Sequence, residues 1–344
     1  MSYRAQGGSP SSEHDRVGDA AETEGDTATG MTGGSARAGR IAVIVLLAIL
    51  PWTWFLIRDA FGPVTDVIAI LLPSLAAAVA VVAVLVAALI GRGRRAALAL
   101  AVSTLLVAAV ATVAPWVPRD AGATGPARSV RIAAANIGAG ELEGTTDLLG
   151  LGADVLVISE IGAPLTARLS AAYPQHVEVL NGPNIGVFSR LPFTVLEGPS
   201  ADLPGFLLRV DGPAGQFDLI AAHVPRPWWT ARGPSYQTTV NGHHRLVEQI
   251  AARAARARLP VVVAGDLNTS DRARNYRVLT DDAELTDAML DNWAGPTQIG
   301  HWATLLVRID HILVSRGWCG DDSSRYPIPA SDHRGIISTV GPCL

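Results

Sequence analysis

Polar side chains that could bind a metal ion or move a proton recur in the C-terminal two thirds of the sequence, at or beside short apolar runs. In chain order they are Asn136, Glu160, His223, Asp266, Asn268, Asp310, Asp332 and His333. Each one alone is better explained as a solvated strand end or a turn residue. Strand ends that share one edge of a packed sheet can, however, converge on a single pocket. Together these residues predict one polar site at the edge of a sheet.

The elements that must position these side chains are short apolar runs separated by turns. We predict strands at Ser129–Ala135, Asp154–Ser159, Ile185–Ser189, Phe217–His223, Leu259–Ala264 and Arg308–Val314. Helices are expected near Thr145–Gly150 and Thr239–Arg256. Short strands mixed with helices, without a solenoid repeat, favour an α/β fold in the form of a two-layer sandwich.

The order and local context of these residues resemble the endonuclease/exonuclease/phosphatase superfamily. The most specific pieces are Gly265–Asn268 (Gly-Asp-Leu-Asn), Ile309–His311 (Ile-Asp-His) and Ser331–His333 (Ser-Asp-His), and Gly186–Pro192 also fits the family pattern. The resemblance covers about residues 129–340. It implies the sandwich of that family, with four layers in the order α/β/β/α, and the hydrolysis of phosphate esters with a divalent cation.

The resemblance also implies a role for each polar residue. Glu160 would supply the main carboxylate to Mg²⁺ or Mn²⁺, aided by Asn136 and Asp332. Such ions keep bound waters and meet the phosphate oxygens of the substrate. Asp266 and Asn268 would position the attacking water and a phosphate oxygen, with Asp266 near any second metal ion. The sequence leaves one and two metal ions both open.

Two histidines complete the implied site. His333 would act as general base or as a phosphate-stabilising cation, oriented through its ring N–H by Asp310. His223 would donate a hydrogen bond to the phosphate as negative charge develops there. Either Asp266 or His333 could accept the proton of the water. One position departs from the family: many relatives carry Gln before the metal-binding Glu, where this chain has Ser159, and this concerns the surroundings of the metal rather than the reaction class.

Several other conspicuous residues receive less specific interpretations. His311 follows the orienting aspartate within a strand and should point to the opposite face. His243 and His244 lie on a predicted helix, so all three histidines are placed outside the site. Trp228 and Trp229 follow the first catalytic histidine closely. Adjacent tryptophans more often pack against their own domain, but a lipid-facing role gains weight in a domain held near a bilayer.

The N-terminal third of the chain is far more apolar than the rest. Residues 1–40 contain few large apolar side chains, which predicts a disordered tail. Three apolar runs follow, each near the roughly 20 residues that cross a bilayer as a helix. The predicted order is a disordered cytoplasmic tail at 1–40, transmembrane helices at 41–57, 67–90 and 96–117 (together 41–117), a linker at 118–128 and a phosphoesterase domain at 129–344.

Arginines in the short connections predict the orientation of these helices. Arg37 and Arg40 precede the first apolar run, and Arg92, Arg94 and Arg95 lie between the second and third runs. Because such arginines tend to stay in the cytoplasm, three spans place the rest of the chain outside. The sequence therefore predicts a multi-pass plasma membrane protein with an extracellular catalytic domain.

Charge and cysteine content limit the possible partners. From residue 121 onward the chain has 18 arginines against 22 acidic residues. General nucleic-acid binders usually carry a basic surplus, so nucleic acid is a disfavoured substrate. The two cysteines, Cys319 and Cys343, are too few for a zinc site. We predict that they form a disulfide that closes a loop around Ser331–His333.

These predictions combine into a metal-dependent phosphoesterase that hydrolyses a phosphate ester or pyrophosphate of a membrane lipid on the extracytoplasmic face. The anchor and domain order resemble VanJ-type glycopeptide-resistance proteins, which act on polyprenyl-pyrophosphate carriers of the cell wall; a phospholipid is the other candidate substrate. An extracellular nuclease of the same superfamily is one alternative, disfavoured by the acidic domain. A catalytically inactive protein that binds lipid headgroups is another, disfavoured because a pure binder does not need the Asp310–His333 pair. No protein partner follows from the sequence.

Overall fold

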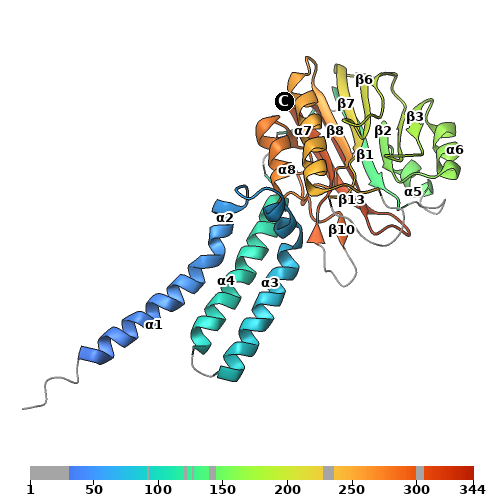
Figure 1. The fold of residues 1–344 in the computed structure, drawn as a ribbon. Coiled ribbons are helices and arrows are strands. Elements are labelled where there is room, and N and C mark those ends of the chain that lie inside the picture. The colour runs from blue at the N-terminus through green and yellow to red at the C-terminus, as the bar shows by residue number, and fades with distance from the viewer. Residues whose placement is uncertain are drawn as a thin grey trace, which may run out of the picture. The chain divides into compact units, whose positions relative to one another are not determined.

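The architecture is taken from a computed structural model (Figure 1). Residues up to Val43 and residues from Ile44 to Leu344 form two compact units, and the second unit contains all of the predicted site. The structure describes residues 31–90, 93–119, 122–125, 128–138, 145–227, 236–299 and 306–344.

Three helical segments are long and apolar enough to cross a membrane, at Arg37–Ile57, Pro63–Leu89 and Arg94–Trp116. Each begins a few residues before the corresponding predicted run. Many of their leucine and valine side chains are exposed, which suits a lipid environment. The helices that form the segments are α1 (Met31–Ile49), η1 (Leu50–Thr53), α2 (Trp54–Ile57), α3 (Pro63–Ile90), α4 (Arg94–Val113) and η2 (Ala114–Trp116).

The start of α1 corrects the predicted boundary of the disordered tail. α1 begins at Met31, so residues 31–40 are helical rather than disordered. Once an apolar run has formed a helix, each preceding residue joins by adding one hydrogen bond, which costs much less than nucleation. Arg37 and Ala38 are good helix formers but Gly33, Gly34 and Gly39 are poor ones, so the extension depends on the apolar run that follows.

α3 packs along α4 through small side chains. Ala76 and Ala80 of α3 are buried, as are Ala101 and Ala108 of α4. Such residues allow two helix backbones to approach closely. α3 also contains Pro73, which has no N–H to donate to the preceding turn of the helix.

Two six-stranded sheets form the C-terminal part of the chain, in the orders β13-β14-β1-β2-β4-β3 and β5-β6-β7-β8-β12-β9, with a separate β10-β11 hairpin. The strands are β1 (Val130–Asn136), β2 (Val155–Ser159), β3 (Gln175–Val179), β4 (Ile185–Ser189), β5 (Phe193–Glu197), β6 (Gly205–Gly212), β7 (Gly215–His223), β8 (Val261–Asp266), β9 (Thr286–Asp287), β10 (Gln298–Ile299), β11 (Leu306–Val307), β12 (Asp310–Val314), β13 (Trp318–Pro327) and β14 (Arg334–Pro342). The helices of this part are α5 (Thr145–Gly150), α6 (Ala163–Ala172), α7 (Val240–Arg256), α8 (Arg274–Arg277) and η5 (Val278–Asp282).

Three apolar clusters show how these layers stack. One cluster lies between the two sheets and includes Ile132 of β1 and Leu219 of β7. A second joins α7 to the second sheet and includes Val247. A third joins α5 and α6 to the first sheet and includes Leu148 and Leu165. Helices therefore cover the outer face of each sheet, and the domain is the predicted four-layer α/β/β/α sandwich (Figure 1).

All six predicted strands are present, most with ends shifted by one or two residues, and both predicted helices are present as α5 and α7. The predictions omitted several strands, of which β13 is the longest. The sequence of β13 is rich in aspartate and serine and has no regular apolar alternation, and the strand lies at the edge of its sheet. Charged side chains and a bulge, such as the irregularity between Asp321 and Ser324, are common in edge strands because they discourage pairing with another chain.

A disulfide closes the C-terminal end of the chain. It joins Cys319 of β13 to Cys343, whose Cα atoms are 5.1 Å apart. The loop closed in this way contains Ser331–His333, so the predicted pairing is confirmed. Part of the predicted linker reaches the same region, because Thr124 forms an antiparallel bridge with Cys343.

Candidate active site

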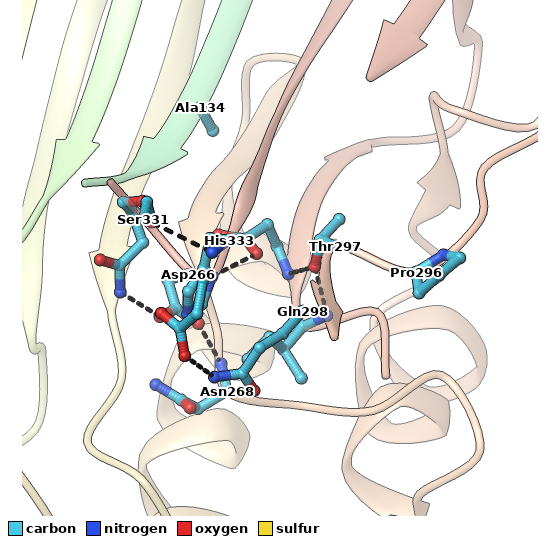
Figure 2. A network of polar contacts seen from close by, with 12 residues as sticks. Ala134, Asp266, Asn268, Pro296, Thr297, Gln298, Ser331 and His333 are labelled. Carbon is cyan, nitrogen blue, oxygen red and sulfur yellow. Dashed lines mark hydrogen bonds and ion pairs between the residues drawn. The ribbon is translucent and has the colours of Figure 1, made fainter. Parts of the chain in front are cut away.

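The strand register brings most of the predicted residues to one edge of the two sheets. β1 and β2 run parallel, with Asn136 opposite Ser159. β7 and β8 are also parallel, with His223 opposite Asp266. β12 runs antiparallel to β8 and places Asp310 opposite Asp266. Residues that are far apart in the sequence therefore meet where these strands end (Figure 2).

Two carboxylates and one imidazole form the centre of the site. Nδ1 of His333 lies 2.9 Å from Oδ2 of Asp310. Ligand atoms of Asp266, Asp310 and His333 all lie within 4.8 Å of one another, and all three residues are buried. A carboxylate can only accept a hydrogen bond, so Nδ1 carries the proton of this pair. The predicted carboxylate–imidazole pair is therefore present in the fold.

Asn136 connects Glu160 to this centre. Its Nδ2 donates to Oδ2 of Asp266 at 2.8 Å and lies 3.3 Å from Oε1 of Glu160. Glu160 has a φ of 55°, a left-handed conformation that is costly for a residue with a Cβ. Its backbone N–H donates to the carbonyl oxygen of Asn184 at 2.8 Å, which holds the strained turn. Strain of this kind is often found at functional sites.

The Gly-Asp-Leu-Asn sequence forms a second strained turn. Asn268 has a φ of 46°, and its backbone N–H donates to Oδ1 of Asp266 at 2.9 Å. Its Nδ2 donates to the carbonyl oxygen of Val224 at 2.9 Å. Gly265 has a φ of 135°, and a Cβ at this position would collide with the carbonyl oxygen of Ala222. The glycine is therefore required by the close approach of β7, and it allows Asp266 and Asn268 to reach the site.

His223 lies at the edge of the same centre. Its Nδ1 is 2.5 Å from the carbonyl oxygen of Pro183, and its Nε2 is 3.8 Å from Oδ2 of Asp266. The carbonyl requires a proton on Nδ1, so Nε2 is the nitrogen that faces the carboxylates. The ring of Tyr236 packs against the imidazole, with ring centres 5.0 Å apart.

Two residues that the sequence analysis did not single out support the Ile-Asp-His and Ser-Asp-His segments. Oγ1 of Thr297 accepts hydrogen bonds from the backbone N–H groups of Ile309 and Asp310, at 3.0 and 3.1 Å. Gln298 donates from Nε2 to Oδ2 of Asp332 at 3.1 Å, next to His333 (Figure 2). Neither residue ends an apolar run or belongs to a motif, so only the tertiary structure could identify them.

Ser331 fixes the backbone at the start of that segment. Its Oγ donates to the carbonyl oxygen of Asn136 at 2.8 Å and accepts from the backbone N–H of His333 at 3.0 Å. It thereby ties the His333 turn to the end of β1. Asp332 is exposed and lies outside the group formed by Asp266, Asp310 and His333. Its predicted role as a metal ligand stays a prediction.

Electrostatics in the centre are dominated by the buried carboxylates. Burial raises the pKa of Asp266, and the neighbouring Asp310 raises it further. Burial alone would lower the pKa of His333, but the charge and hydrogen bond of Asp310, with smaller contributions from Asp266 and Asp332, raise it to about 10. His333 is therefore cationic near neutral pH, which suits the predicted phosphate-stabilising role.

The donor set fits a hard divalent cation. Oδ1 of Asp310 is buried and accepts no hydrogen bond within the part of the chain that the structure describes. The pKa of Asp266 is raised first by burial and then by the negative charge of Asp310. Glu160, Asp266 and Asp310 offer carboxylate oxygens of the kind that Mg²⁺ and Mn²⁺ prefer. Asn136 turns Nδ2 toward these carboxylates, and its Oδ1 accepts from the backbone N–H of Gly138 at 2.9 Å, so its predicted role as a ligand stays a prediction. A cation at the carboxylate oxygens would relieve the repulsion between the carboxylates.

The histidines predicted to be outside the site are indeed used elsewhere. Nε2 of His311 is 2.7 Å from the carbonyl oxygen of Thr269, and Nε2 of His243 is 3.1 Å from that of Leu267. His244 pairs with a neighbour on α7. The adjacent tryptophans at 228 and 229 lie outside the described residues.

The chain is similar to a known protein family in sequence and to several solved structures. Residues 121–333 match the sequence model of the Endonuclease/Exonuclease/phosphatase family. The comparison with curated proteins finds no match. Similar solved structures include an endonuclease/exonuclease/phosphatase from Beutenbergia cavernae, with 20% identity, a TM-score of 0.44 and coverage of 63% of this chain and 72% of that one. A humanized D. rerio TDP2 has 15% identity, a TM-score of 0.48 and coverage of 62% and 99%. Sphingomyelinase C from Streptomyces griseocarneus has 15% identity, a TM-score of 0.41 and coverage of 61% and 99%.

Proposed function

Because the chain belongs to the endonuclease/exonuclease/phosphatase family, we propose that it hydrolyses a phosphate ester or pyrophosphate of a membrane lipid. The observation that carries this proposal is the buried group of Asp266, Asp310 and His333 beside Asn136 and Glu160. It combines an oxygen-rich cation site with an imidazole that a carboxylate orients. This combination serves the attack of water on phosphorus rather than simple binding.

The proposed roles follow from the positions of the side chains. Glu160, with the buried aspartates, would hold Mg²⁺ or Mn²⁺, which neutralises charge on phosphate oxygens when it is bound. Asn136 would orient these carboxylates through its Nδ2. His333 would donate from Nε2 to an oxygen that gains charge, because Nδ1 is committed to Asp310. Asp266 lies where it can orient the attacking water.

The three apolar helices support a lipid substrate. We propose that they span the plasma membrane, because they have the required length and hydropathy. Asp66, in the first turn of α3, forms a 3.0 Å ion pair with Arg274 of the catalytic domain, so that end of α3 and the domain lie on the same side. Arg94 and Arg95 begin α4, and they follow the opposite end of α3, which ends at Ile90. Since arginine-rich connections tend to stay in the cytoplasm, the catalytic domain would lie outside.

The two alternatives make different predictions. A nuclease of the same family would need to attract nucleic acid, and the acidic surplus from residue 121 onward argues against this. An inactive headgroup-binding protein would not require the His333–Asp310 pair, which is buried and hydrogen-bonded in the fold.

The test is a substrate panel on the full-length protein in detergent, with Mg²⁺ and with EDTA. The panel contains a polyprenyl pyrophosphate, a phospholipid, bis(p-nitrophenyl) phosphate and plasmid DNA. We expect Mg²⁺-dependent release of phosphate or of a phosphorylated headgroup from a lipid, lost in His333→Ala. Cleavage of DNA at a rate equal to or above that of every lipid would support the nuclease instead. Headgroup binding without hydrolysis of any member would support the inactive binder.

A further inference from the structure

The chain segment that follows the Gly-Asp-Leu-Asn turn leads directly to the apolar helices. Arg272 lies four residues after Asn268 and is 2% exposed. Its Nε donates to the carbonyl oxygen of Ala69 at 2.9 Å, and its Nη2 donates to that of Ile70 at 3.3 Å. Both acceptors belong to α3, about two hundred residues earlier in the chain. A buried arginine whose partners on this helix are backbone carbonyls is unusual, because buried charges are normally paired with acids.

The sequence of α3 explains why a carbonyl is available there. In an α-helix the carbonyl of residue i accepts from the N–H of residue i+4. For Ala69 that residue is Pro73, which has no N–H. The carbonyl of Ala69 therefore lacks its usual donor within the helix. The Arg272 guanidinium supplies a replacement donor, and it does so with charge, which makes the hydrogen bond stronger than a neutral one.

The residue beside Arg272 contacts the end of the third apolar segment. Nε1 of Trp116, at the end of η2, donates to Oδ2 of Asp271 at 2.6 Å. The same oxygen accepts from Nε of Arg308 at 3.1 Å. Arg308 lies two residues before Asp310, the partner of His333. The adjacent residues Asp271 and Arg272 thus contact two different apolar segments, the one that ends at Trp116 and α3. They follow β8 in the chain, and Asp271 also contacts Arg308, which precedes β12.

We infer that Arg272 and the Ala69 carbonyl, which Pro73 leaves without a helix donor, form a docking contact through which the apolar helices position the Asp266–Asn268 turn of the active site. Arg272 is a positioning residue in this scheme, because it contacts the carbonyls of α3 and not the reacting atoms. The consequence is that the helices belong to the working structure of the hydrolase and are more than a tether. This inference concerns how the site is held, and it does not depend on which phosphate ester is the substrate.

The test compares Arg272→Gln, Pro73→Ala and the double variant in the full-length protein in detergent. Backbone hydrogen exchange of residues 266–273 is the primary measurement, because it does not require activity. Losing a buried charged hydrogen bond should speed exchange about tenfold or more in this turn. Pro73→Ala should produce the same local change, since the new alanine would donate its own backbone N–H to the carbonyl of Ala69 and compete with Arg272. The double variant should exchange no faster than the faster single variant.

The second measurement is the hydrolysis of bis(p-nitrophenyl) phosphate. We expect kcat to fall about tenfold with little change in KM, because a displaced turn affects the transition state more than binding. Arg272→Lys should restore part of kcat, since an ammonium can still donate to one of the carbonyls. Matched controls are Arg245→Gln, which removes an exposed pair with Asp202, and Pro164→Ala at the start of α6. Both should leave exchange in 266–273 unchanged.

Two outcomes would overturn the inference. If Arg272→Gln and Pro73→Ala lower the melting temperature but leave exchange in 266–273 and kcat unchanged, the contact only stabilises the fold. If the changes in exchange caused by Arg272→Gln and Pro73→Ala add in the double variant, the two residues do not act through the same Ala69 carbonyl. Should Arg272→Gln fail to fold, Pro73→Ala alone decides, because it introduces a good helix former. A failure of the lipid assignment would leave the exchange results untouched, so the two proposals can be told apart.

Discussion

Single residues at the centre of the site carry charges that depend on their neighbours. His333, beside Asp310, has a pKa raised to about 10, and a protonated imidazole cannot act as a metal ligand. Glu160 instead offers a carboxylate beside Asn136. The two residues should therefore respond differently to substitution, although both belong to the same site.

We expect Glu160→Gln to weaken Mn²⁺ binding about tenfold or more, because an amide replaces a charged ligand. His333→Gln should leave Mn²⁺ affinity nearly unchanged and lower kcat about 10²–10⁴-fold. Asp310→Asn should resemble a milder form of the His333 change. Mn²⁺ titration followed by electron paramagnetic resonance, combined with kinetics, measures both properties. Loss of Mn²⁺ binding in His333→Gln would instead assign the ion to the group of Asp266, Asp310 and His333.

Two buried histidines predict how stability depends on pH. Burial lowers the pKa of His243 from 6.5 to about 4, and burial together with the charge of Arg308 does the same for His311. Between these values the unfolded chain binds protons that the folded chain does not, so stability falls as pH drops from about 6.5 to 4. Each residue should contribute on the order of 3 kcal/mol over that range. The pairing of His333 acts in the opposite direction: its stabilisation is complete below about pH 6.5 and lost as pH rises through about 10.

The measurement is the thermal midpoint of the detergent-solubilised protein from pH 4 to 7. His311→Gln should make the thermal midpoint depend less on pH, because glutamine does not titrate. His244→Gln is the matched control, since His244 is partly exposed and pairs with Glu248. An equal slope in His311→Gln and the parent protein would contradict the assignment.

At the scale of elements, the Ser-Asp-His segment connects the paired strands β13 and β14. The Cys319–Cys343 disulfide links the start of β13 to the residue that follows β14. The bridge spans 24 residues, and the chain-entropy model gives about 3 kcal/mol for a loop of this size. Cys319→Ser with Cys343→Ser should therefore lower the free energy of unfolding by about that amount. Chemical denaturation with and without reductant measures the effect: reductant should destabilise the parent protein and leave the double variant unchanged. Equal sensitivity of both proteins to reductant would contradict this prediction.

At the scale of the whole molecule, the proposed attachment to a bilayer should favour substrates that lie in it. Tethering raises the effective concentration of lipids near the site and does nothing comparable for soluble esters. Trp228 and Trp229 follow His223 closely in the sequence, and aromatic rings of this kind suit a lipid interface. We therefore expect Trp228→Ala with Trp229→Ala to slow hydrolysis of lipid in vesicles about tenfold while sparing bis(p-nitrophenyl) phosphate. Equal loss of both activities would show that the pair maintains the fold instead.

The sequence by itself determined the properties that depend on residues close together in the chain. Apolar length defined the three candidate spans, and short apolar runs with polar ends defined six strands and the residues that follow them. Such signals are local because hydropathy and strand alternation are read within about twenty residues. A polar and serine-rich edge strand such as β13 carries no such signal, and helix extension to Met31 depends on cooperativity rather than on composition.

Only the tertiary structure decided which of these residues meet. Asp310 meets Asp266 because β12 pairs with β8 in one register, and His333 reaches Asp310 from the segment before β14. Asp332, its neighbour in the chain, remains exposed beside Gln298. Thr297 supports Asp310 from a segment without any motif. The contact between Arg272 and the carbonyl that Pro73 leaves without a donor joins positions about two hundred residues apart. Sequence patterns report neither strand register nor the pairing of distant backbone groups, because both are set by the packing of the whole chain.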